Sequence, residues 1–206
     1  GGLATAVTCT TTTSPSSVSV GDVNNDGKNE IVAGNGMDSI DILSYSGAGT
    51  LISLATYTSA NTLLIRIADL NNDGLLDVVG IGWGTDSADV FLQNAKGTLD
   101  PPITYTVSHG GWDDLEIGDI NNDGLVDIIV MSGQGLSSNI CVLTQRADGA
   151  LDPAVCYGLG GNAGTDGMAV GDVNGDTLKD IVVTYQDYSS TYSHRLAVFP
   201  QNNAGT

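Results

Sequence analysis

Residues 119–127, with the sequence DINNDGLVD, carry the pattern that decides the fold of this chain. The same pattern of acidic and amide residues begins at residues 22, 69, 119 and 172, so that the four copies start 47, 50 and 53 residues apart. An alternating apolar segment precedes each copy and an apolar run follows it, as residues 115–117 and 128–130 do here. Self-similarity at this period indicates an array of supersecondary units.

Each unit has the sequence pattern of short strands. In the second unit the predicted strands are residues 65–67, 78–79, 89–93 and 103–107. The 28 glycines of the chain argue against long helices, because glycine is a poor helix former. A four-stranded antiparallel sheet of roughly 50 residues has the size of a propeller blade. The sequence therefore predicts an all-β fold, a β-propeller of four blades that forms a single domain over residues 1–206.

The two ends of the chain suggest how the propeller closes. The fourth unit stops after its third strand, at residues 198–206, whereas the second unit continues from the equivalent residues 90–98 into a fourth strand. Residues 3–11 could supply the missing strand, so we expect an N-terminal strand to complete the last blade. Such closure removes exposed strand edges. The alternative is that the four units belong to a longer array that is cut in the same phase at both ends.

Each repeat places oxygen-bearing side chains at positions 1, 3, 5 and 9 of a nine-residue loop, and a backbone carbonyl at position 7 can join them. Alternate side chains of a tight loop turn toward one centre, and an all-oxygen set of this size favours Ca²⁺ over Mg²⁺. Glycine at position 6 permits the bend in the first three loops, whereas the fourth loop has Thr177 there. We expect up to four Ca²⁺ ions, held by Asp22, Asn24, Asp26, Lys28 and Glu30; by Asp69, Asn71, Asp73, Leu75 and Asp77; by Asp119, Asn121, Asp123, Leu125 and Asp127; and by Asp172, Asn174, Asp176, Leu178 and Asp180.

Two other interpretations compete with that of a strand–loop–strand calcium site, and the first of them does not fit the sequence. An EF-hand has a similar spacing, but it needs flanking helices and a glutamate at position 12, where this chain has Ala33, Gly80, Val130 and Val183. The second alternative is a solvated acidic turn without metal. Twelve of the 24 acidic residues lie in the four loops, and carboxylates packed so closely repel one another unless a cation neutralises them.

These loops resemble the FG-GAP/VCBS repeat family, which includes the calcium-loop propellers of integrin α-subunits and some fungal lectins. The resemblance covers essentially the whole chain, although the FG and GAP sequences are reduced to fragments such as Val32-Ala33-Gly34. It implies a β-propeller, calcium in the loop between the first two strands of each blade, and extracellular work. Relatives commonly have seven blades, so four repeats are a departure. The family does not imply one ligand.

The propeller face opposite the calcium loops is the predicted ligand face. Aromatic residues that do not follow the repeat gather there, whereas periodic ones such as Tyr57 and Tyr105 are expected in the core. Aromatic rings beside carboxylates suit the apolar face and the hydroxyl groups of a sugar, or a protein hot spot. Alternatively, these rings fill gaps between blades. The predicted ligand-binding residues are Trp83, Asp86, His109, Trp112, Asp113, Tyr185, Tyr188 and Tyr192, with Asp114, Asp187 and His194 nearby.

Composition limits the partners and the compartment. The 24 acidic residues against 6 Lys and Arg give a net charge of −18, which argues against nucleic acid as a partner. The sequence has no apolar run of about 20 residues, so we expect no insertion into a membrane.

Cys141 and Cys156 fall on neighbouring predicted strands and form either a disulfide or two buried thiols. A disulfide and calcium loops would both suit a secreted protein.

We therefore expect a secreted calcium-binding recognition module that is not an enzyme and that binds extracellular carbohydrate, as lectins do. One alternative is an integrin-like adhesion module that binds a cell-surface protein. Another is an accessory or catalytic part of a polysaccharide-degrading enzyme, in which Asp113, Asp114 and Glu116 would supply an acid–base pair. No hydrolase or metalloprotease motif accompanies them. A homo-oligomer in which two chains share one ring is also open.

Overall fold

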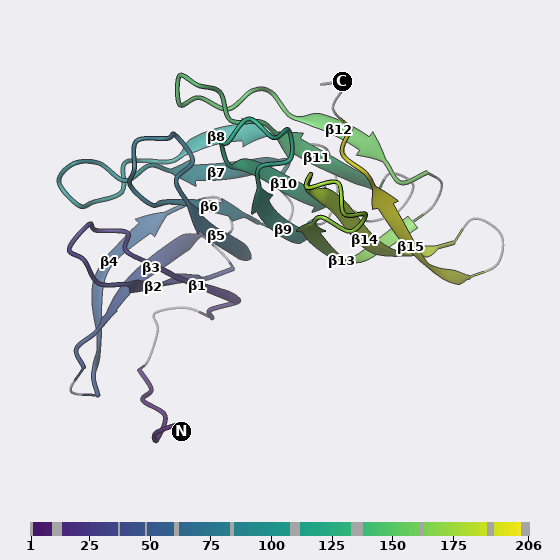
Figure 1. Ribbon diagram of the computed structural model, residues 1–206. Coiled ribbons are helices and arrows are strands. Elements are labelled where there is room, and N and C mark those ends of the chain that lie inside the picture. The colour runs from purple at the N-terminus through teal and green to yellow at the C-terminus, as the bar shows by residue number, and fades with distance from the viewer. Residues whose placement is uncertain are drawn as a thin grey trace.

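In the computed structural model, the regular secondary structure of the described residues consists of β-strands. The described residues are 2–9, 14–36, 38–47, 49–59, 62–82, 85–107, 112–132, 138–160, 163–188 and 192–202. They form four antiparallel sheets, one for each sequence repeat (Figure 1). Within these residues there is no helix with the length and apolar character that a membrane span requires.

Strand order follows chain order in every sheet, so each repeat folds as a meander. The first sheet consists of β1 (Ser17–Gly21), β2 (Glu30–Gly34), β3 (Ser39–Tyr45) and β4 (Leu51–Thr58). The second consists of β5 (Leu64–Ala68), β6 (Asp77–Ile81), β7 (Ser87–Phe91) and β8 (Ile103–Thr106). The third consists of β9 (Trp112–Gly118), β10 (Asp127–Ser132), β11 (Asn139–Leu143) and β12 (Val155–Gly158). The fourth consists of β13 (Ala163–Gly171), β14 (Asp180–Asp187) and β15 (Ser193–Phe199). The predicted blades are thereby confirmed.

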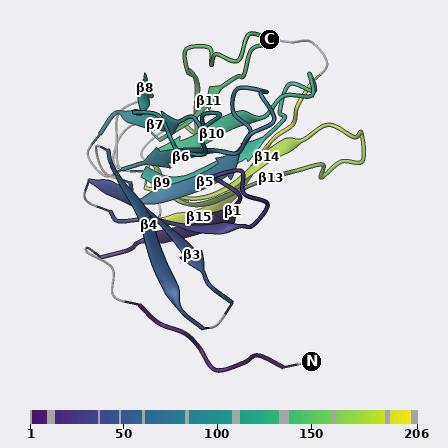
Figure 2. The ribbon, with the colours of Figure 1, turned by 90° about the vertical axis from the view of Figure 1, so that its left-hand side faces the viewer.

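The sheets stack in chain order through their first strands. Strand β1 contacts β5, β5 contacts β9, and β9 contacts β13, so the repeats follow one another along an arc (Figures 1 and 2). One apolar cluster lies at each of the three junctions between successive sheets. We call the face of a sheet that packs on the following repeat its leading face, and the opposite face its trailing face.

The second sheet shows why both faces must be apolar. Its residues Ile65 and Val78 belong to the cluster shared with the first sheet, whereas Val79 and Val90 belong to the cluster shared with the third. Since neighbouring residues on a strand point to opposite faces, a sheet packed on both sides needs apolar residues in succession. In the second sheet, the apolar run that follows the acidic loop is therefore a second strand, β6, that packs against both the first and the third sheet.

The expected closure by an N-terminal strand is wrong. The fourth sheet has three strands, and residues 2–9 form no strand. These residues run beside the first sheet instead, where Cys9 lines a hollow together with Leu43 and Leu51. The chain is fixed there by Ser16, whose backbone N–H donates to the carbonyl oxygen of Gly34 at 2.8 Å. In the described residues the first and fourth sheets stand at the two ends of the arc, and the N-terminal segment forms no strand beside β15 (Figure 1).

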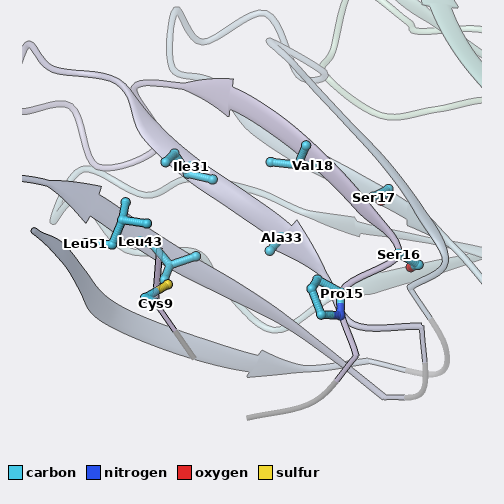
Figure 3. A pocket seen from close by; sticks show the side chains of 9 residues that line it. All are labelled: Cys9, Pro15, Ser16, Ser17, Val18, Ile31, Ala33, Leu43 and Leu51. Atoms are coloured by element: carbon cyan, nitrogen blue, oxygen red, sulfur yellow. The ribbon is translucent and has the colours of Figure 1, made fainter. Parts of the chain in front are cut away.

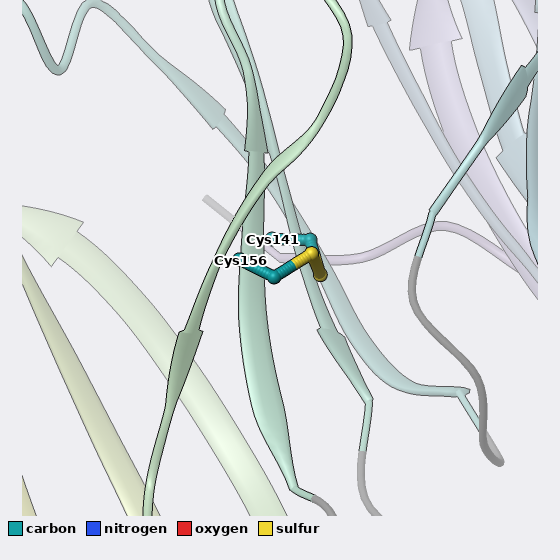
Figure 4. Close-up of a disulfide and its surroundings, with 2 residues drawn as sticks. All are labelled: Cys141 and Cys156. Carbon is teal, nitrogen blue, oxygen red and sulfur yellow. A yellow bond between two sulfur atoms is a disulfide. The ribbon is translucent and has the colours of Figure 1, made fainter.

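Cys141 and Cys156 lie directly opposite each other on β11 and β12 and form a disulfide (Figure 4). The bond ties the third strand of the third sheet to its outermost strand. Cys9, the remaining cysteine, is free and exposed. The sequence left a disulfide and two thiols open, and the register of this hairpin decides for the disulfide.

Candidate metal loops and ligand surface

The four acidic loops share one pattern of internal hydrogen bonds. In the first loop the Asp22 carboxylate accepts the backbone N–H groups of Asp26 at 3.1 Å and Gly27 at 2.9 Å. Asn24 Oδ1 accepts the N–H of Asp26 at 2.9 Å, and Asp26 Oδ1 accepts that of Lys28 at 2.9 Å. The same bonds recur in the second and third loops. In the fourth loop the Asp172 carboxylate accepts the N–H groups of Gly175 and Thr177, and the bonds accepted at positions 3 and 5 are conserved. Alternation of short oxygen-bearing side chains thus turns the oxygens at positions 1, 3 and 5 into each loop.

Two left-handed residues produce the bend in every loop. At position 4 the backbone φ is 57° in Asn25 and 85° in Gly175, both residue types that tolerate this conformation. At position 6 the first three loops have glycine, and in the fourth Thr177 takes the same conformation with a φ of 74°. Threonine is strained there because its Cβ approaches the following carbonyl oxygen. The fourth loop therefore keeps the fold of the others at a conformational cost.

The first loop has the arrangement of a cation site. The carboxyl oxygens of Asp22, Asp26 and Glu30 lie within 4.8 Å of one another, and no other three acidic, cysteine or histidine residues in the described ranges meet this criterion. Glu30 is only 1% exposed, and its Oε2 has no hydrogen-bond partner. Burial, and then the charges of Asp26 and Asp22, raise the pKa of Glu30. A buried, unpartnered carboxylate oxygen beside two other carboxylates fits a hard cation such as Ca²⁺.

The acids at position 9 of the other loops also hold the backbone together. Both oxygens of Asp77 accept backbone N–H groups, one from Leu70 and one from Gln93, each at 2.8 Å. Asp127 and Asp180 make the equivalent pairs of bonds. Aspartate is one methylene shorter than Glu30, so its carboxylate stays against the backbone. Each of these oxygens has a second lone pair that a cation could use.

Burial raises the pKa of two of these acids. Desolvation outweighs the hydrogen bonds that each accepts and raises the pKa of Asp77 and of Asp127 to about 6. The charges of the acids at positions 5 and 1 of the same loop raise the pKa further. A positive charge in the loop would oppose both effects.

The first and second acidic loops are also joints between two blades. Gln93 of the second repeat donates from Nε2 to the carbonyl oxygen of Asp22 at 3.2 Å, and Gln145 of the third repeat does the same to Asp69 at 3.4 Å. The turn after each glutamine lies against the same loop, since a Cβ added to Gly97 would come within 2.3 Å of the Asn24 carbonyl oxygen. These glutamines were not among the residues predicted from the sequence, although they recur two residues after the third strand. A cation in a loop would therefore act on the packing of adjacent blades.

The tryptophan side of the predicted ligand face lies mostly outside the described residues. Trp83 and His109 are not among them, and Trp112 and Asp113 are placed only as backbone of β9. Asp86 is exposed between β6 and β7, and its backbone carbonyl accepts the N–H of Val107 at 2.9 Å. The face predicted around the two tryptophans therefore stays a prediction.

The structure describes the three tyrosines of that predicted face, of which one packs against the core and two are exposed. Tyr185 is partly buried and packs on the cluster between the third and fourth sheets, which is the role of a core residue. Tyr188 and Tyr192 are 42% and 63% exposed, and their ring centroids lie 5.5 Å apart. Tyr192 also contacts the His194 ring edge to face, with centroids 5.2 Å apart. We call Tyr188, Tyr192 and His194 the tyrosine cluster.

Gln186 fixes the orientation of this cluster. The hydroxyl groups of Tyr188 and Tyr192 both donate to Gln186 Oε1, at 2.6 and 2.7 Å. The Nε2 group of Gln186 in turn donates to Asp166 Oδ1 at 3.0 Å. The result is an exposed pair of tilted rings with polar groups at one edge.

Comparison with known proteins identifies the repeats. The FG-GAP-like repeat is matched three times, over residues 22–80, 69–130 and 119–183, so the overlapping matches span most of the chain. The chain belongs to the FG-GAP-like repeat family. FG-GAP repeats indicate a β-propeller-type recognition or adhesion module. Each match begins at the first aspartate of an acidic loop, and this loop pattern occurs in all four repeats.

A solved structure supports the architecture of these FG-GAP repeats. A chain of the Photorhabdus luminescens Tc holotoxin pore is similar, with a TM-score of 0.53 at 13% sequence identity. The similarity covers 90% of this chain but 9% of that chain, and at this identity it shows the fold alone. The chain matches no curated protein.

Asp114 and Glu116, two of the three acids considered as an acid–base pair, connect FG-GAP blades, whereas the side chain of Asp113 lies outside what the structure describes. Glu116 Oε1 lies 2.9 Å from Arg66 Nη2, and Asp114 Oδ1 lies 3.7 Å from the same nitrogen. Asp114 Oδ2 also accepts the backbone N–H of Met168 at 2.8 Å. These contacts join the second, third and fourth sheets along their first strands.

Proposed function

We propose that this protein is a secreted, calcium-stabilised recognition module without catalytic activity, and that it binds extracellular carbohydrate. The observation that carries the proposal is the exposed tyrosine cluster with its polar edge. The metal loops lie at the other end of the strands and between blades, so they support the scaffold. Recognition then belongs to the opposite end of the sheets.

The calcium part of the proposal rests on charge and position. The net charge of −18 would fall to −10 with four bound Ca²⁺ ions. Folding already removes the unpartnered Glu30 oxygen from water, so a cation that binds it adds no further desolvation cost for this oxygen. The cation would also replace the repulsion among the three carboxylates by their attraction to a positive charge. Extracellular calcium is high enough to fill weak sites of this kind, and a disulfide persists in the same compartment.

The carbohydrate part rests on complementary chemistry. The exposed faces of Tyr188 and Tyr192 offer flat apolar area to the C–H face of a sugar ring. Gln186, Asp166 and His194 offer hydrogen-bond donors and acceptors beside those rings, where sugar hydroxyl groups would lie. Since Gln186 already orients both phenol groups, little side-chain freedom would be lost on binding.

A glycan array, probed with and without EDTA, tests the proposal. We expect wild-type protein in calcium to bind a defined class of glycans, and Tyr188→Ala and Tyr192→Ala to weaken that binding at least tenfold. Tyr45→Ala is the matched control, because Tyr45 is 50% exposed on the first sheet, remote from the cluster. Absence of glycan binding in both states would contradict the lectin function. Binding that survives both tyrosine variants would place the site elsewhere.

Two further assays, of binding to cell-surface proteins and of polysaccharide turnover, separate the alternatives. Binding to cell-surface proteins without any glycan would favour an adhesion module. Turnover of a polysaccharide by the chain, abolished by Asp113→Asn, would favour an enzyme and contradict the proposed absence of catalysis.

A further inference from the structure

The tyrosine cluster stands on an extension of the fourth sheet. Strand β14 ends 15 residues after the first aspartate of its acidic loop, whereas β2, β6 and β10 end 12, 12 and 13 residues after theirs. Strand β13 begins 9 residues before its loop, and β9 begins 7 residues before its own. Tyr188 and Tyr192 therefore lie beyond the ends of the equivalent strands and outside the apolar clusters that join successive sheets.

The backbone under the cluster leaves room for one of the rings. Gly164 of β13 and His194 of β15 both lie directly opposite Gln186 of β14, so the three residues form one row across the sheet. A Cβ added to Gly164 would come within 2.9 Å of the Tyr188 hydroxyl oxygen. Tyr188 thus covers the place that a larger residue at position 164 would fill, and the position of its ring depends on the fold of the sheet.

A β-bulge brings an acid to this row. Thr165 pairs with Tyr185 and Gly167 pairs with Thr184, so Asp166 is an extra residue without a pairing partner on β14. Bulges re-aim side chains, and this one turns the exposed Asp166 toward Gln186, whose Nε2 donates to Asp166 Oδ1 at 3.0 Å. A carboxylate has about four lone-pair sites, so most of the accepting capacity of Asp166 is left for a ligand.

Asp166 gives the surface beside the rings a negative charge. Asp187, the other acid of the extension, lies with its Oδ2 2.8 Å from Arg195 Nε. Because neighbouring residues on a strand point to opposite faces, this ion pair lies on the trailing face, whereas Gln186 lies on the leading face. Residues 184–194 contain no Lys or Arg. The cluster therefore has an acid beside it without a fixed cation, in a chain whose net charge is −18.

The two phenol rings also suit a positive charge. Both hydroxyl groups donate to Gln186 Oε1, which increases the electron density of each ring. The face of a tyrosine ring attracts a cation that lies within about 6 Å of the ring centroid. The chain of hydrogen bonds from the hydroxyl groups through Gln186 ends at Asp166, so each bond polarises the next. Rings and carboxylate therefore act on a ligand as one connected unit.

The hollow on the first sheet offers no such chemistry. Figure 3 shows that apolar side chains such as Ile31, Leu43 and Leu51 line it, together with Cys9 and two serines. None of its nine lining residues carries a charge. A charged ligand would lose hydration there without a compensating partner.

We propose that the tyrosine cluster binds a sugar that carries a protonated amino group, as in a polymer of deacetylated hexosamine. This inference rests on the proposed function, because it names the class of carbohydrate for the same site. The C–H face of the sugar lies on the exposed rings, and its ammonium group donates to Asp166 and lies near a ring face. N-acetylation removes the positive charge, and Asp166 repels a sugar that carries an acid.

Calorimetric titration of the wild-type chain in calcium, with an oligomer of β-1,4-linked glucosamine and with its N-acetylated form of equal length, tests this. We expect the glucosamine oligomer to bind roughly tenfold more tightly, as a hydrogen bond to a charged group implies, and the preference to shrink in high salt. Asp166→Asn keeps the shape of the side chain and the bond from Gln186 but removes the charge, so it should make the two affinities equal.

Asp38→Asn is the matched control. Asp38 is exposed in the turn between β2 and β3, which is the counterpart in the first sheet of the turn between β14 and β15. This variant removes the same charge at the same end of the strands but away from the cluster, so the preference for the glucosamine oligomer should remain. Thermal unfolding shows that both variants are folded, as expected for substitutions at exposed positions.

The outcomes distinguish this inference from the proposed function. Equal or tighter binding of the N-acetylated oligomer by the wild-type chain overturns the inference, and so does a preference that survives Asp166→Asn. If neither oligomer binds while other glycans on the array do, the amino sugar is the wrong class and the lectin function stands. If no glycan binds at all, both are wrong.

Discussion

Cys141 and Cys156 form their disulfide at the repeat position where the first two sheets have an aspartate–threonine hydrogen bond. The three pairs join the third and fourth strands directly across the hairpin, and in each the two residues are 15 apart in sequence. The hydrogen-bonded pairs are Asp41 with Thr56, at 2.6 Å, and Asp89 with Thr104, at 2.7 Å. One register thus supports a covalent link in one blade and a polar link in two others.

The first prediction concerns this link. Replacing both cysteines by serine should cost about 3 kcal/mol of unfolding free energy, the value for a loop of about 15 residues. Cys141→Asp with Cys156→Thr should recover about 1 kcal/mol, because it restores the bond of the other repeats. Urea unfolding of the two double variants measures both. Equal stability of the two variants would show that the polar link is not transferable between blades.

Thr177 provides the second prediction. Thr177→Gly should raise the unfolding free energy by about 1 kcal/mol, since it removes left-handed strain from a β-branched residue. The reciprocal change Gly124→Thr, in the third loop, should lower it by a similar amount. Thermal unfolding of both variants tests the pair, and a stabilising effect of Gly124→Thr would contradict the argument.

The third prediction separates the metal from the fold at Glu30. Glu30→Gln keeps the shape of the side chain and removes the charge that burial disfavours. In EDTA the variant should be more stable than wild type, whereas in calcium it should be less stable because a charged ligand is lost. Melting temperatures in both conditions measure the change of sign.

Asp123→Ala should likewise lower calcium affinity and the melting temperature in calcium, and an unchanged value would argue against metal in the third loop.

The fourth prediction is a pH dependence in the absence of metal. Folding raises the pKa of Asp77 and Asp127 from 3.8 to about 6, so the native state binds more protons than the unfolded state between these values. Unfolding free energy in EDTA should therefore rise as pH falls from 7 through 6 toward 4. Asp77→Asn should flatten this profile. A wild-type profile in EDTA that falls over the same range would contradict the prediction.

The fifth prediction concerns the contact between the first acidic loop and the second blade. Gly97 and Gly27 both have left-handed backbones, with φ of 74° and 83°. A Cβ at Gly97 would lie 2.3 Å from the Asn24 carbonyl oxygen, whereas a Cβ at Gly27 would meet nothing within 4 Å. Gly97→Ala should therefore destabilise the protein more than Gly27→Ala does. Equal losses in thermal unfolding would mean that backbone strain alone decides both.

The sequence by itself determined what depends on short stretches of chain. Alternating oxygens and a left-handed residue at position 6 specify the metal loop within nine residues, because the hydrogen bonds that form it are local. The runs that flank each loop specify strands that pair with their sequence neighbours. The same reasoning placed Cys141 and Cys156 on neighbouring strands.

Tertiary structure decided the features that join residues about 50 or more apart. Whether an N-terminal strand reaches β15 depends on the angle that four blades span, and no local pattern encodes that angle. Packing between blades also buried Tyr185 while Tyr188 stayed exposed, and it placed Gln93 against the loop of Asp22, 71 residues away. Local hydrogen bonding fixes the shape of a blade, whereas the apolar faces of whole sheets fix how blades meet and where the arc ends.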